Sequence, residues 1–285
     1  MSIANFIPNV WAEGIERDLV PKCTFAEDCN RKFEGQVKKL GESVSVIGVG
    51  KPTIYTINRE NSGDQIQKPE TLEDVSSTMI INQMSYFNYM VGDVDKVQAM
   101  DGLQEALQSE TSDAMASTMD AHIASCALDK SITRLHGTTP KKVVIGTPGE
   151  GEVNVLHVIE DAVTMLYKRN VAQSTRVVAN VSPDFYKLVC RELGYRDTDN
   201  SKLLEDAIVR RYGSVYIKMS NNVAVEGGVD HIMLRTPYAV AFALAHTHVE
   251  AYRPEDYFAD AIKGFHLYQA KVMRSKEIID INVTY

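Results

Sequence analysis

Apolar residues near the start of the chain repeat with a helical period. Trp11, Ile15 and Leu19 are spaced four residues apart, which places them on one face of a short helix over residues 8–20. The sequence then favours an extended stretch to about residue 36. A single short helix cannot cover its own apolar face, so we expect this N-terminal arm to pack against another surface.

The pattern changes to an alternation of apolar and polar residues over residues 37–91. Val44 and Val46 alternate with serines, and residues 78–91 are rich in β-forming types, as is typical of strands. A polar stretch at residues 58–69 separates the two β-type runs, which predicts a long two-stranded hairpin with a polar tip. An isolated hairpin is only marginally stable in water, so this segment also needs another surface.

A long helix is predicted over residues 93–130, because apolar residues recur there every three to four positions. At a rise of about 1.5 Å per residue this helix is about 50 Å long. Its polar positions carry eight acidic residues and two lysines, so the polar face is strongly negative. The apolar stripe consists of Leu103, Leu107, Met115, Met119, Ile123 and Cys126.

The second half of the chain alternates between helical and β-type patterns. Ser182 followed by Pro183 is a helix start signal. The whole region predicts a compact mixture of helices and strands, followed by strands that return at the C-terminus. We expect helices at residues 153–169, 182–193 and 237–245, and strands at residues 176–181, 215–219, 231–235, 246–253 and 264–284.

The composition is that of a globular protein, with 44% hydrophobic and 24% charged residues among 285. A formal net charge of −8 gives little electrostatic attraction to phosphates, which argues against a dedicated nucleic-acid-binding protein. The four cysteines contain no Cys-x-x-Cys pair, which argues against a zinc site or a disulfide framework and suits a reducing cytoplasm. Neither a secretory signal nor an apolar run of membrane-spanning length is evident, so we expect a soluble protein with no membrane partner.

Motifs that would carry enzymatic chemistry are incomplete. Residues 48–53 resemble the end of a phosphate-binding loop, but Pro52 separates the lysine from the threonine whose hydroxyl would bind magnesium. His246, His248 and Glu250 alternate along a predicted strand, so they would share one face and could hold a metal ion. An ordinary polar sheet face explains the same residues. We therefore predict no catalytic residue, no cofactor and no metal, and keep a metal-dependent enzyme built on these three residues as an alternative.

The order of the predicted elements is itself informative, and three short motifs accompany it. They lie at residues 6–11 (Phe-Ile-Pro-x-x-Trp), 33–37 (Phe-Glu-Gly-x-Val) and 86–95 (Tyr-Phe-x-Tyr-x-Val-x-Asp-x-Asp). Together, the order and the motifs resemble the major capsid proteins of tailed bacteriophages with the Hong Kong 97 fold. The resemblance implies an α+β fold with these parts: an N-terminal arm (1–36), an E-loop hairpin leading into the P-domain (37–91), the P-domain with its spine helix (92–152), an A-domain (153–245) and P-domain return strands (246–285).

The same resemblance implies a structural, non-enzymatic subunit that self-assembles into the icosahedral head shell around double-stranded DNA. Pentamers and hexamers would tile the shell, with the arm and the hairpin lying on neighbouring subunits. The residues expected at those contacts are Trp11, Ile15, Leu19, Phe33, Ile54, Tyr55, Arg59, Glu60, Asp64 and Lys68. The spine helix would face the interior and would repel packaged DNA, or dock a basic scaffolding protein, through Asp101, Glu105, Glu110, Asp113 and Asp120.

The partners that the resemblance implies are other copies of the chain, a portal protein and DNA packaged without sequence specificity. No long helical extension precedes the arm, so we expect the scaffolding protein of the procapsid to be a separate chain. A decoration protein on the outer surface is a further expected partner. The subunit would be assembled in the host cytoplasm and would end in the virion. An encapsulin nanocompartment, which has the same fold and holds cargo enzymes, is an alternative.

Overall fold

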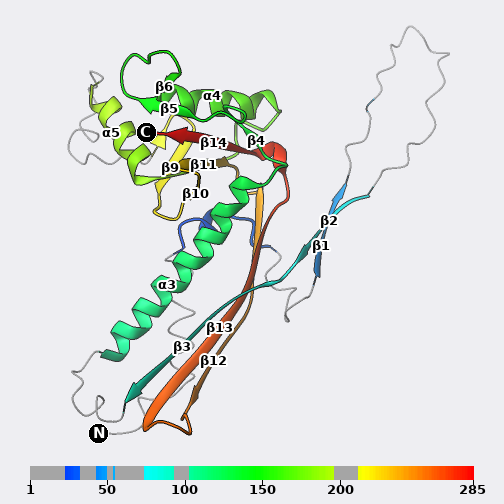
Figure 1. The fold of residues 1–285 in the computed structure, drawn as a ribbon. Helices are drawn as coiled ribbons and strands as arrows, with labels where there is room; N and C mark the ends of the chain where they lie inside the picture. The colour runs from blue at the N-terminus through cyan, green and yellow to red at the C-terminus, as the bar shows by residue number, and fades with distance from the viewer. Residues whose placement is uncertain (1–22, 33–42, 50–53, 55–73, 93–102, 196–210) are drawn as a thin grey trace, which may run out of the picture.

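The computed structural model describes residues 23–32, 43–49, 54, 74–92, 103–195 and 211–285. These residues form three sheets and three α-helices. A nine-stranded sheet with two helices makes up one end of the molecule, and a long three-stranded sheet with the third helix extends away from it (Figure 1). A separate two-stranded hairpin lies to the side of the three-stranded sheet. No helix in these ranges is long and apolar enough to cross a membrane.

The nine-stranded sheet is mixed, because β7 and β9 are parallel whereas β11 is antiparallel to both β7 and β14. Its main path has the order β6-β5-β14-β11-β7-β9-β8, with β4 beside β14 and β10 beside β11. The C-terminal strand therefore lies in the middle of this sheet. The strands are β4 (Thr133–Arg134), β5 (Lys141–Val144), β6 (Glu152–Asn154), β7 (Val177–Val181), β8 (Arg211–Tyr212), β9 (Val215–Met219), β10 (Ala224–Glu226), β11 (Val229–Arg235) and β14 (Ile278–Thr284).

Helices α4 (Val155–Lys168) and α5 (Pro183–Tyr195) contribute to one apolar core with this sheet. The side chain of Asn154 accepts a hydrogen bond from the backbone of Leu156 and so caps α4. The hydroxyl of Ser182 accepts from the backbone of Phe185 in the same way at the start of α5. The sequence predicted both helices, and β7, β9 and β11, to within two residues at each boundary.

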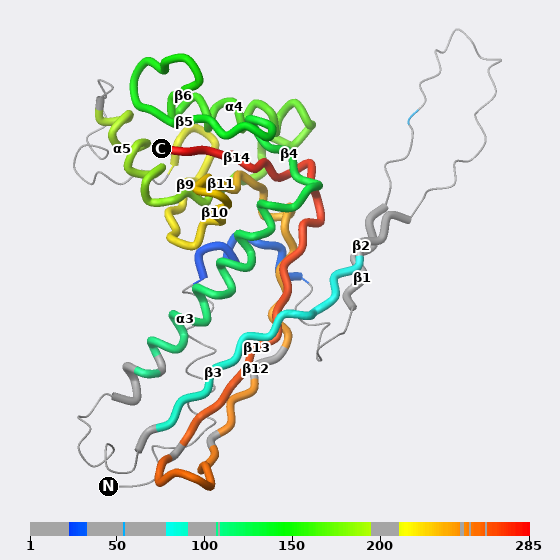
Figure 2. Tube along the Cα trace, viewed as in Figure 1, coloured from blue at the N-terminus to red at the C-terminus, as the bar shows by residue number. Residues whose placement is uncertain are grey.

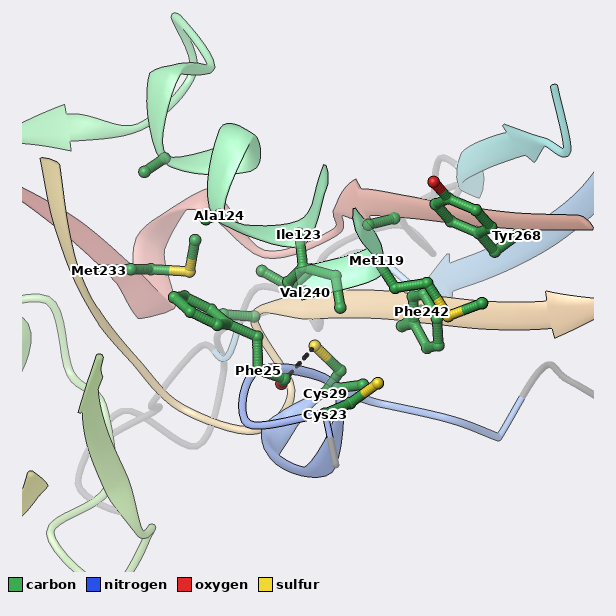
Figure 3. Packing of buried hydrophobic residues seen from close by; sticks show 14 of the residues in the cluster. Cys23, Phe25, Cys29, Met119, Ile123, Ala124, Met233, Val240, Phe242 and Tyr268 are labelled. Carbon is green, nitrogen blue, oxygen red and sulfur yellow. Dashed lines mark hydrogen bonds between the residues drawn. The ribbon is translucent and has the colours of Figure 1, made fainter. Parts of the chain in front are cut away.

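The three-stranded sheet has the order β12-β13-β3, and all its neighbours are antiparallel. Its strands are β3 (Gln83–Gly92), β12 (Val240–Tyr252) and β13 (Ala259–Val272), which run side by side in Figure 2. Helix α3 (Leu103–Ser125) packs against the sheet and continues into the 3₁₀ turn η4 (Cys126–Leu128). Met119 and Ile123 of α3, with Val240, Phe242 and Tyr268 of the sheet, belong to one buried cluster (Figure 3).

The predicted long helix is confirmed over part of its range. Within the described ranges it begins at Leu103, and residues 93–102 lie outside them. Its 23 residues correspond to about 35 Å of helix. Met115, Met119 and Ile123 are buried as expected from the apolar stripe.

The predicted hairpin is present, but its second strand is different from the one expected. Strand β1 (Ser43–Val49) pairs with β2 (Asp74–Ile80) in a register that joins Ser43 to Ile80. The β-type run after Ile80 does not continue this hairpin, because β3 pairs with β13 instead. Met79 and Ile81 at the junction are buried against the three-stranded sheet, which turns the chain from one sheet into the other.

The predicted helix at residues 237–245 is wrong, because β12 begins within this range at Val240. Val240 and Phe242 face the core under α3, whereas Ala241 and Ala243 face Met79 on the other side of the sheet. A strand that is buried on both faces has an unbroken apolar sequence, so its period of two is hidden and the run resembles a buried helix.

The extended stretch predicted to residue 36 contains a short helical turn. Residues 23–32 include the 3₁₀ turn η2 (Ala26–Asp28). Another such turn, η5 (Ser275–Glu277), precedes the last strand. The helix predicted at residues 8–20 and the polar tip at residues 58–69 lie outside the described residues.

Candidate assembly surfaces

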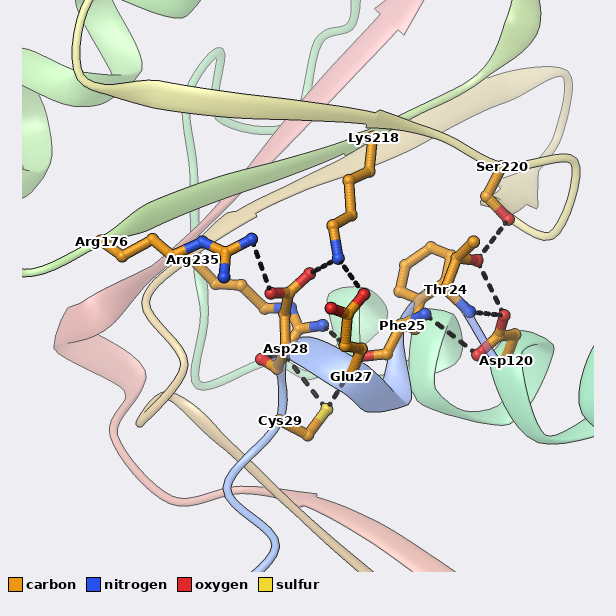
Figure 4. A network of polar contacts seen from close by, with 10 residues as sticks. All are labelled: Thr24, Phe25, Glu27, Asp28, Cys29, Asp120, Arg176, Lys218, Ser220 and Arg235. Atoms are coloured by element: carbon orange, nitrogen blue, oxygen red, sulfur yellow. Dashed lines mark hydrogen bonds and ion pairs between the residues drawn. The ribbon is translucent and has the colours of Figure 1, made fainter. Parts of the chain in front are cut away.

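Residues 23–32, hereafter the docked segment, are held against α3 by the carboxylate of Asp120 (Figure 4). The backbone nitrogen and the hydroxyl of Thr24 donate to Oδ2 of Asp120 at 2.7 and 2.8 Å. The backbone nitrogen of Phe25 donates to Oδ1 at 3.1 Å. Burial raises the pKa of Asp120, although these hydrogen bonds act in the opposite direction. One carboxylate thus fixes the beginning of the docked segment.

Asp120 was expected on the exposed acidic face of the helix, and this expectation is wrong. Its side chain is 2% exposed, because the docked segment covers it. Glu110 and Asp113 are exposed as expected. Asp101 and the side chain of Glu105 lie outside the described residues. The negative surface of α3 is therefore smaller than its sequence suggests.

Arg235 bridges the two ends of the short turn in the docked segment. Its guanidinium is fully buried and donates to the backbone oxygens of Asp28 and Phe25, at 2.5 and 2.8 Å. It also lies 3.2 Å from the sulfur of Cys29. A buried cation needs such acceptors to offset its desolvation, so Arg235 and the turn depend on each other.

Acidic side chains of the docked segment pair with cations of the nine-stranded sheet. Lys218 lies 2.5 Å from Glu27 and 2.6 Å from Asp28, and Arg176 lies 3.3 Å from Asp28. The hydrogen bond from Lys218 lowers the pKa of Glu27. These ion pairs connect the docked segment to β9 and to the residue just before β7.

The end of the docked segment joins the edge of the three-stranded sheet. The backbone nitrogen of Asn30 donates to the oxygen of Val240 at 2.9 Å, and the nitrogen of Phe242 donates to the oxygen of Asn30 at 3.1 Å. The docked segment therefore contacts α3 and both large sheets.

A second surface consists of exposed apolar side chains on β3. Met84, Tyr86 and Met90 alternate along this strand and are 50%, 73% and 56% exposed. The intervening Phe87 is half-buried and packs toward the cluster under α3. Exposed apolar side chains gathered on one strand are typical of an interaction surface. Other large exposed apolar residues include Ile54, Ile80, Tyr257 and Phe258.

Most of the contact residues expected from the sequence cannot be placed. Ile54 is the one that the structure describes, and it is 87% exposed. The others lie outside the described residues: Trp11, Ile15, Leu19, Phe33, Tyr55, Arg59, Glu60, Asp64 and Lys68.

The structure gives no support to the candidate metal ligands. Glu250 pairs with Lys263 at 3.2 Å, and the ring of His248 lies 5.9 Å from that of Phe265. The side chain of His246 is outside the described set. Within the described part of the chain, no three histidine, cysteine or acidic residues are grouped so that they could hold a metal ion.

Sequence reasoning missed the polar residues that hold the docked segment. A signal for Asp120 was available, because it lies four residues from both Ala116 and Ala124 on a buried side of α3. An acidic residue among buried positions of a helix indicates a specific partner. Arg235 had a similar signal, since it directly follows the apolar residues of β11.

Comparisons with known proteins define the fold class. The sequence matches no protein-family model and no curated protein sequence. A solved structure from Mycobacterium phage Che8 has a TM-score of 0.70 and 23% identity, covering 91% of this chain and 90% of that chain. The capsid of Cyanophage P-SCSP1u has a TM-score of 0.65 and 13% identity, covering 87% and 85%. The mature capsid of bacteriophage PhiM1 has a TM-score of 0.63 and 14% identity, covering 90% and 87%. The chain therefore has the fold of a phage capsid protein.

Proposed function

We propose that this chain is a major capsid protein that self-assembles into the icosahedral head of a tailed bacteriophage. The observation that carries the proposal is a fold similarity over about nine-tenths of both chains, repeated in several phage capsid structures. A match over only one domain would leave the function open, because one fold can serve many functions. Here the similarity covers about nine-tenths of this chain.

The Hong Kong 97 parts can be assigned to the observed elements. The spine helix is α3, the E-loop begins with β1 and β2, and the A-domain contains α4, α5 and most of the nine-stranded sheet. The long sheet β12-β13-β3 belongs to the P-domain. The expected boundary between residues 153–245 and 246–285 falls inside β12, so a boundary just before Val240 matches the sheets better.

In this proposal the arm and the E-loop cover neighbouring subunits within pentamers and hexamers. The docked segment supports this role, because Asp120 and Arg235 anchor it to the body of the subunit. The hairpin is likewise fixed at its base by Met79 and Ile81, whereas Ile54 toward its tip is exposed. Many modest contacts of this kind add up to a stable closed lattice.

The remaining partners follow from the same proposal. The exposed carboxylates Glu110 and Asp113 on α3 would face the interior and repel packaged double-stranded DNA, or dock a basic scaffolding protein during procapsid assembly. A portal protein would complete the head, and a decoration protein would bind outside. Assembly would take place in the host cytoplasm, and the product would be the capsid of the virion. We assign no enzymatic activity to the chain.

One comparison favours a second candidate, a nanocompartment shell of the encapsulin type. A virus-like particle from Pyrococcus furiosus has a TM-score of 0.56 and 9% identity, covering 96% of this chain and 98% of that chain. The fold fits both candidates, and the contents of the particle distinguish them.

Electron microscopy of the full chain, expressed with and without its separate scaffolding protein, tests the proposal. We expect closed shells or capsomer rings. Particles that protect double-stranded DNA from nuclease indicate a phage head, whereas particles that hold a cargo enzyme and no DNA indicate a nanocompartment. A chain that forms neither shells nor rings under any of these conditions would contradict both.

A further inference from the structure

A hollow at the C-terminal end of α4 is lined only by residues whose side chains can donate hydrogen bonds. Its volume is about 400 Å³. Strand β4 contributes Thr133, the end of α4 contributes Arg169 and Asn170, and η5 contributes Ser275 and Lys276. No acidic and no apolar residue is among those that line it. We call it the basic hollow, because both of its ionisable residues are cations.

The fold brings these residues together from distant parts of the chain. Thr133 is opposite Ile279 in the parallel pairing of β4 with β14, which places it beside the turn η5 that leads into β14. Asn170 follows the C-cap of α4 and has a φ of 62°, a left-handed conformation that often ends helices. The basic hollow is therefore part of the framework of the nine-stranded sheet, near the start of its C-terminal strand (Figure 1).

The two cations of the basic hollow have no carboxylate partner among the described residues. The acidic residue next to Lys276 in the sequence, Glu277, is held elsewhere. Its carboxylate lies 2.8 Å from Nη1 of Arg274 and accepts a hydrogen bond from the hydroxyl of Thr236. Two like charges that line one hollow without a counter-ion repel each other. An anion between Arg169 and Lys276 would remove this repulsion.

The helix dipole accounts for only part of this positive charge. A cation at the C-terminal end of a helix is favoured, which explains Lys168 and Arg169 but not Lys276, because η5 is a separate element. A second hollow, which Lys168 lines together with Lys141, has Asp161 as its one acidic residue. Four lysine or arginine cations and one carboxylate thus line the two hollows, although the formal net charge of the chain is −8. Positive charge is concentrated at this end of the sheet.

We propose that the basic hollow binds a doubly charged phosphate group. A guanidinium presents a planar fork of donors that fits two phosphate oxygens, and an ammonium group supplies a point charge for another. The hydroxyls of Thr133 and Ser275 and the side-chain amide of Asn170 can donate to the same anion. The two cations match the charge of inorganic phosphate, whereas a phosphate of a nucleic-acid backbone carries one negative charge. The inference concerns the single subunit and does not depend on assembly.

Isothermal titration calorimetry of the unassembled full chain with inorganic phosphate tests the proposal, at constant ionic strength and about pH 7.5, where phosphate carries nearly two negative charges. We expect Arg169→Gln and Lys276→Gln each to weaken binding at least about tenfold, because each removes one charged donor. Lys187→Gln should leave binding unchanged, since Lys187 is an exposed residue of α5 that does not line the basic hollow.

Circular dichroism verifies that each variant is folded, and Lys276→Gln alone carries the test if Arg169→Gln is unfolded, because Lys276 is exposed. Absence of phosphate binding, or equal affinity in the wild type and the folded variants, would overturn the proposal. A short DNA duplex is the second probe. Duplex binding that depends on Arg169 and Lys276, without binding of inorganic phosphate, would also overturn it and would assign the basic hollow to a nucleic-acid backbone.

The chemical reactivity of Lys276 gives an independent test in the unaltered protein. Acetylation of its amine should be about fourfold slower at a phosphate concentration of about three times the Kd, since about three-quarters of the hollows are then occupied. Lys187 should react at the same rate with and without phosphate, and mass spectrometry of peptides measures both residues in one sample. Equal protection of the two lysines would show that phosphate acts by general screening, and would contradict a binding site.

Discussion

Asp120 shows how much of this fold depends on single buried polar groups. Its two carboxylate oxygens accept three hydrogen bonds from Thr24 and Phe25, and Asp120 is the one described acceptor for the two backbone N–H groups among these donors. Burial raises the pKa of this carboxyl, whereas the hydrogen bonds that it accepts act in the opposite direction.

Asp120→Asn should therefore lower the free energy of unfolding by about 1–3 kcal/mol, since the amide nitrogen would face a donor where the wild-type oxygen accepts. Urea unfolding of the unassembled subunit measures this difference. Asp113→Asn is the matched control, because Asp113 lies on the exposed side of the same helix and its replacement should change stability by less than about 0.5 kcal/mol. Equal effects of the two substitutions would show that Asp120 does not hold the docked segment.

His266 gives a pH dependence whose sign can be worked out. Its side chain is fully buried in the three-stranded sheet, and burial lowers its pKa from 6.5 to about 4. In the unfolded chain His266 is therefore protonated below pH 6.5, whereas in the folded chain it is protonated only below about pH 4. The contribution of His266 to the free energy of unfolding is fully present above pH 6.5, and it is lost as the pH falls toward 4.

Between pH 7 and pH 4.5 this residue should account for a loss of about 2 kcal/mol in the free energy of unfolding. His266→Gln removes the titration, so the variant should lose about that much less over the same pH range. Urea unfolding at the two pH values measures both slopes. Identical pH dependence in the variant and the wild type would mean that His266 is protonated in the folded protein as easily as in the unfolded chain.

At the level of single residues, the sequence correctly predicted the buried side chains whose positions follow from local spacing. The buried positions Met115, Met119 and Ile123 were predicted correctly because their helical period is intrinsic to the sequence. Asp120 was predicted as exposed because its partners, Thr24 and Phe25, lie more than 90 residues away in the chain. A residue whose role depends on such a distant contact cannot be read from its own neighbours.

At the level of elements, the pairing of β3 with β13 depends on a glycine. Gly264 is opposite Phe87 in the register, and a Cβ atom at position 264 would lie 2.6 Å from Cζ of that ring. It would also lie 3.1 Å from the backbone oxygen of His248 on β12. The aromatic ring thus occupies the space that a side chain would need.

Gly264→Ala should destabilise the subunit by about 1–3 kcal/mol, because either the ring or the strands must move. In the double variant Gly264→Ala/Phe87→Ala the crowding is relieved, so the two effects should not add, with a coupling of at least about 1 kcal/mol. Chemical unfolding of the four proteins in this cycle gives the coupling energy. Additive effects would show that the ring does not restrict position 264.

The elements that the sequence predicted correctly are those whose pattern is local and whose two faces differ. Helix α4 has one buried and one exposed side, and β9 alternates. β12 has neither property, since Ala241 and Ala243 on one face and Phe242 on the other are all buried. β3 was assigned to the wrong partner, because an alternating strand does not indicate which edge it will join.

At the level of the whole molecule, the order of the elements was more informative than any one of them. The arm, the hairpin, the long helix and the returning strands together indicated a capsid fold, and the comparisons with solved structures confirm that fold. The expected contact residues could not be tested in the same way, because all of them but Ile54 lie outside the described residues. Their partners would also belong to other copies of the chain.

The fold places apolar side chains where one subunit does not cover them, notably Tyr86 on β3 and Phe258 at the far end of the same sheet. Isolated exposed residues of this kind are common, but here they lie on a long sheet that projects from the body. Identical copies must therefore cover the apolar side chains that one copy leaves exposed.

Sedimentation of the purified full chain across a range of concentrations tests this requirement most directly. We predict a sharp transition above a threshold concentration, from the 31.7 kDa subunit or its capsomers to closed particles of uniform and much larger mass. A chain that remains at 31.7 kDa at every concentration, with or without a scaffolding protein, would contradict the account.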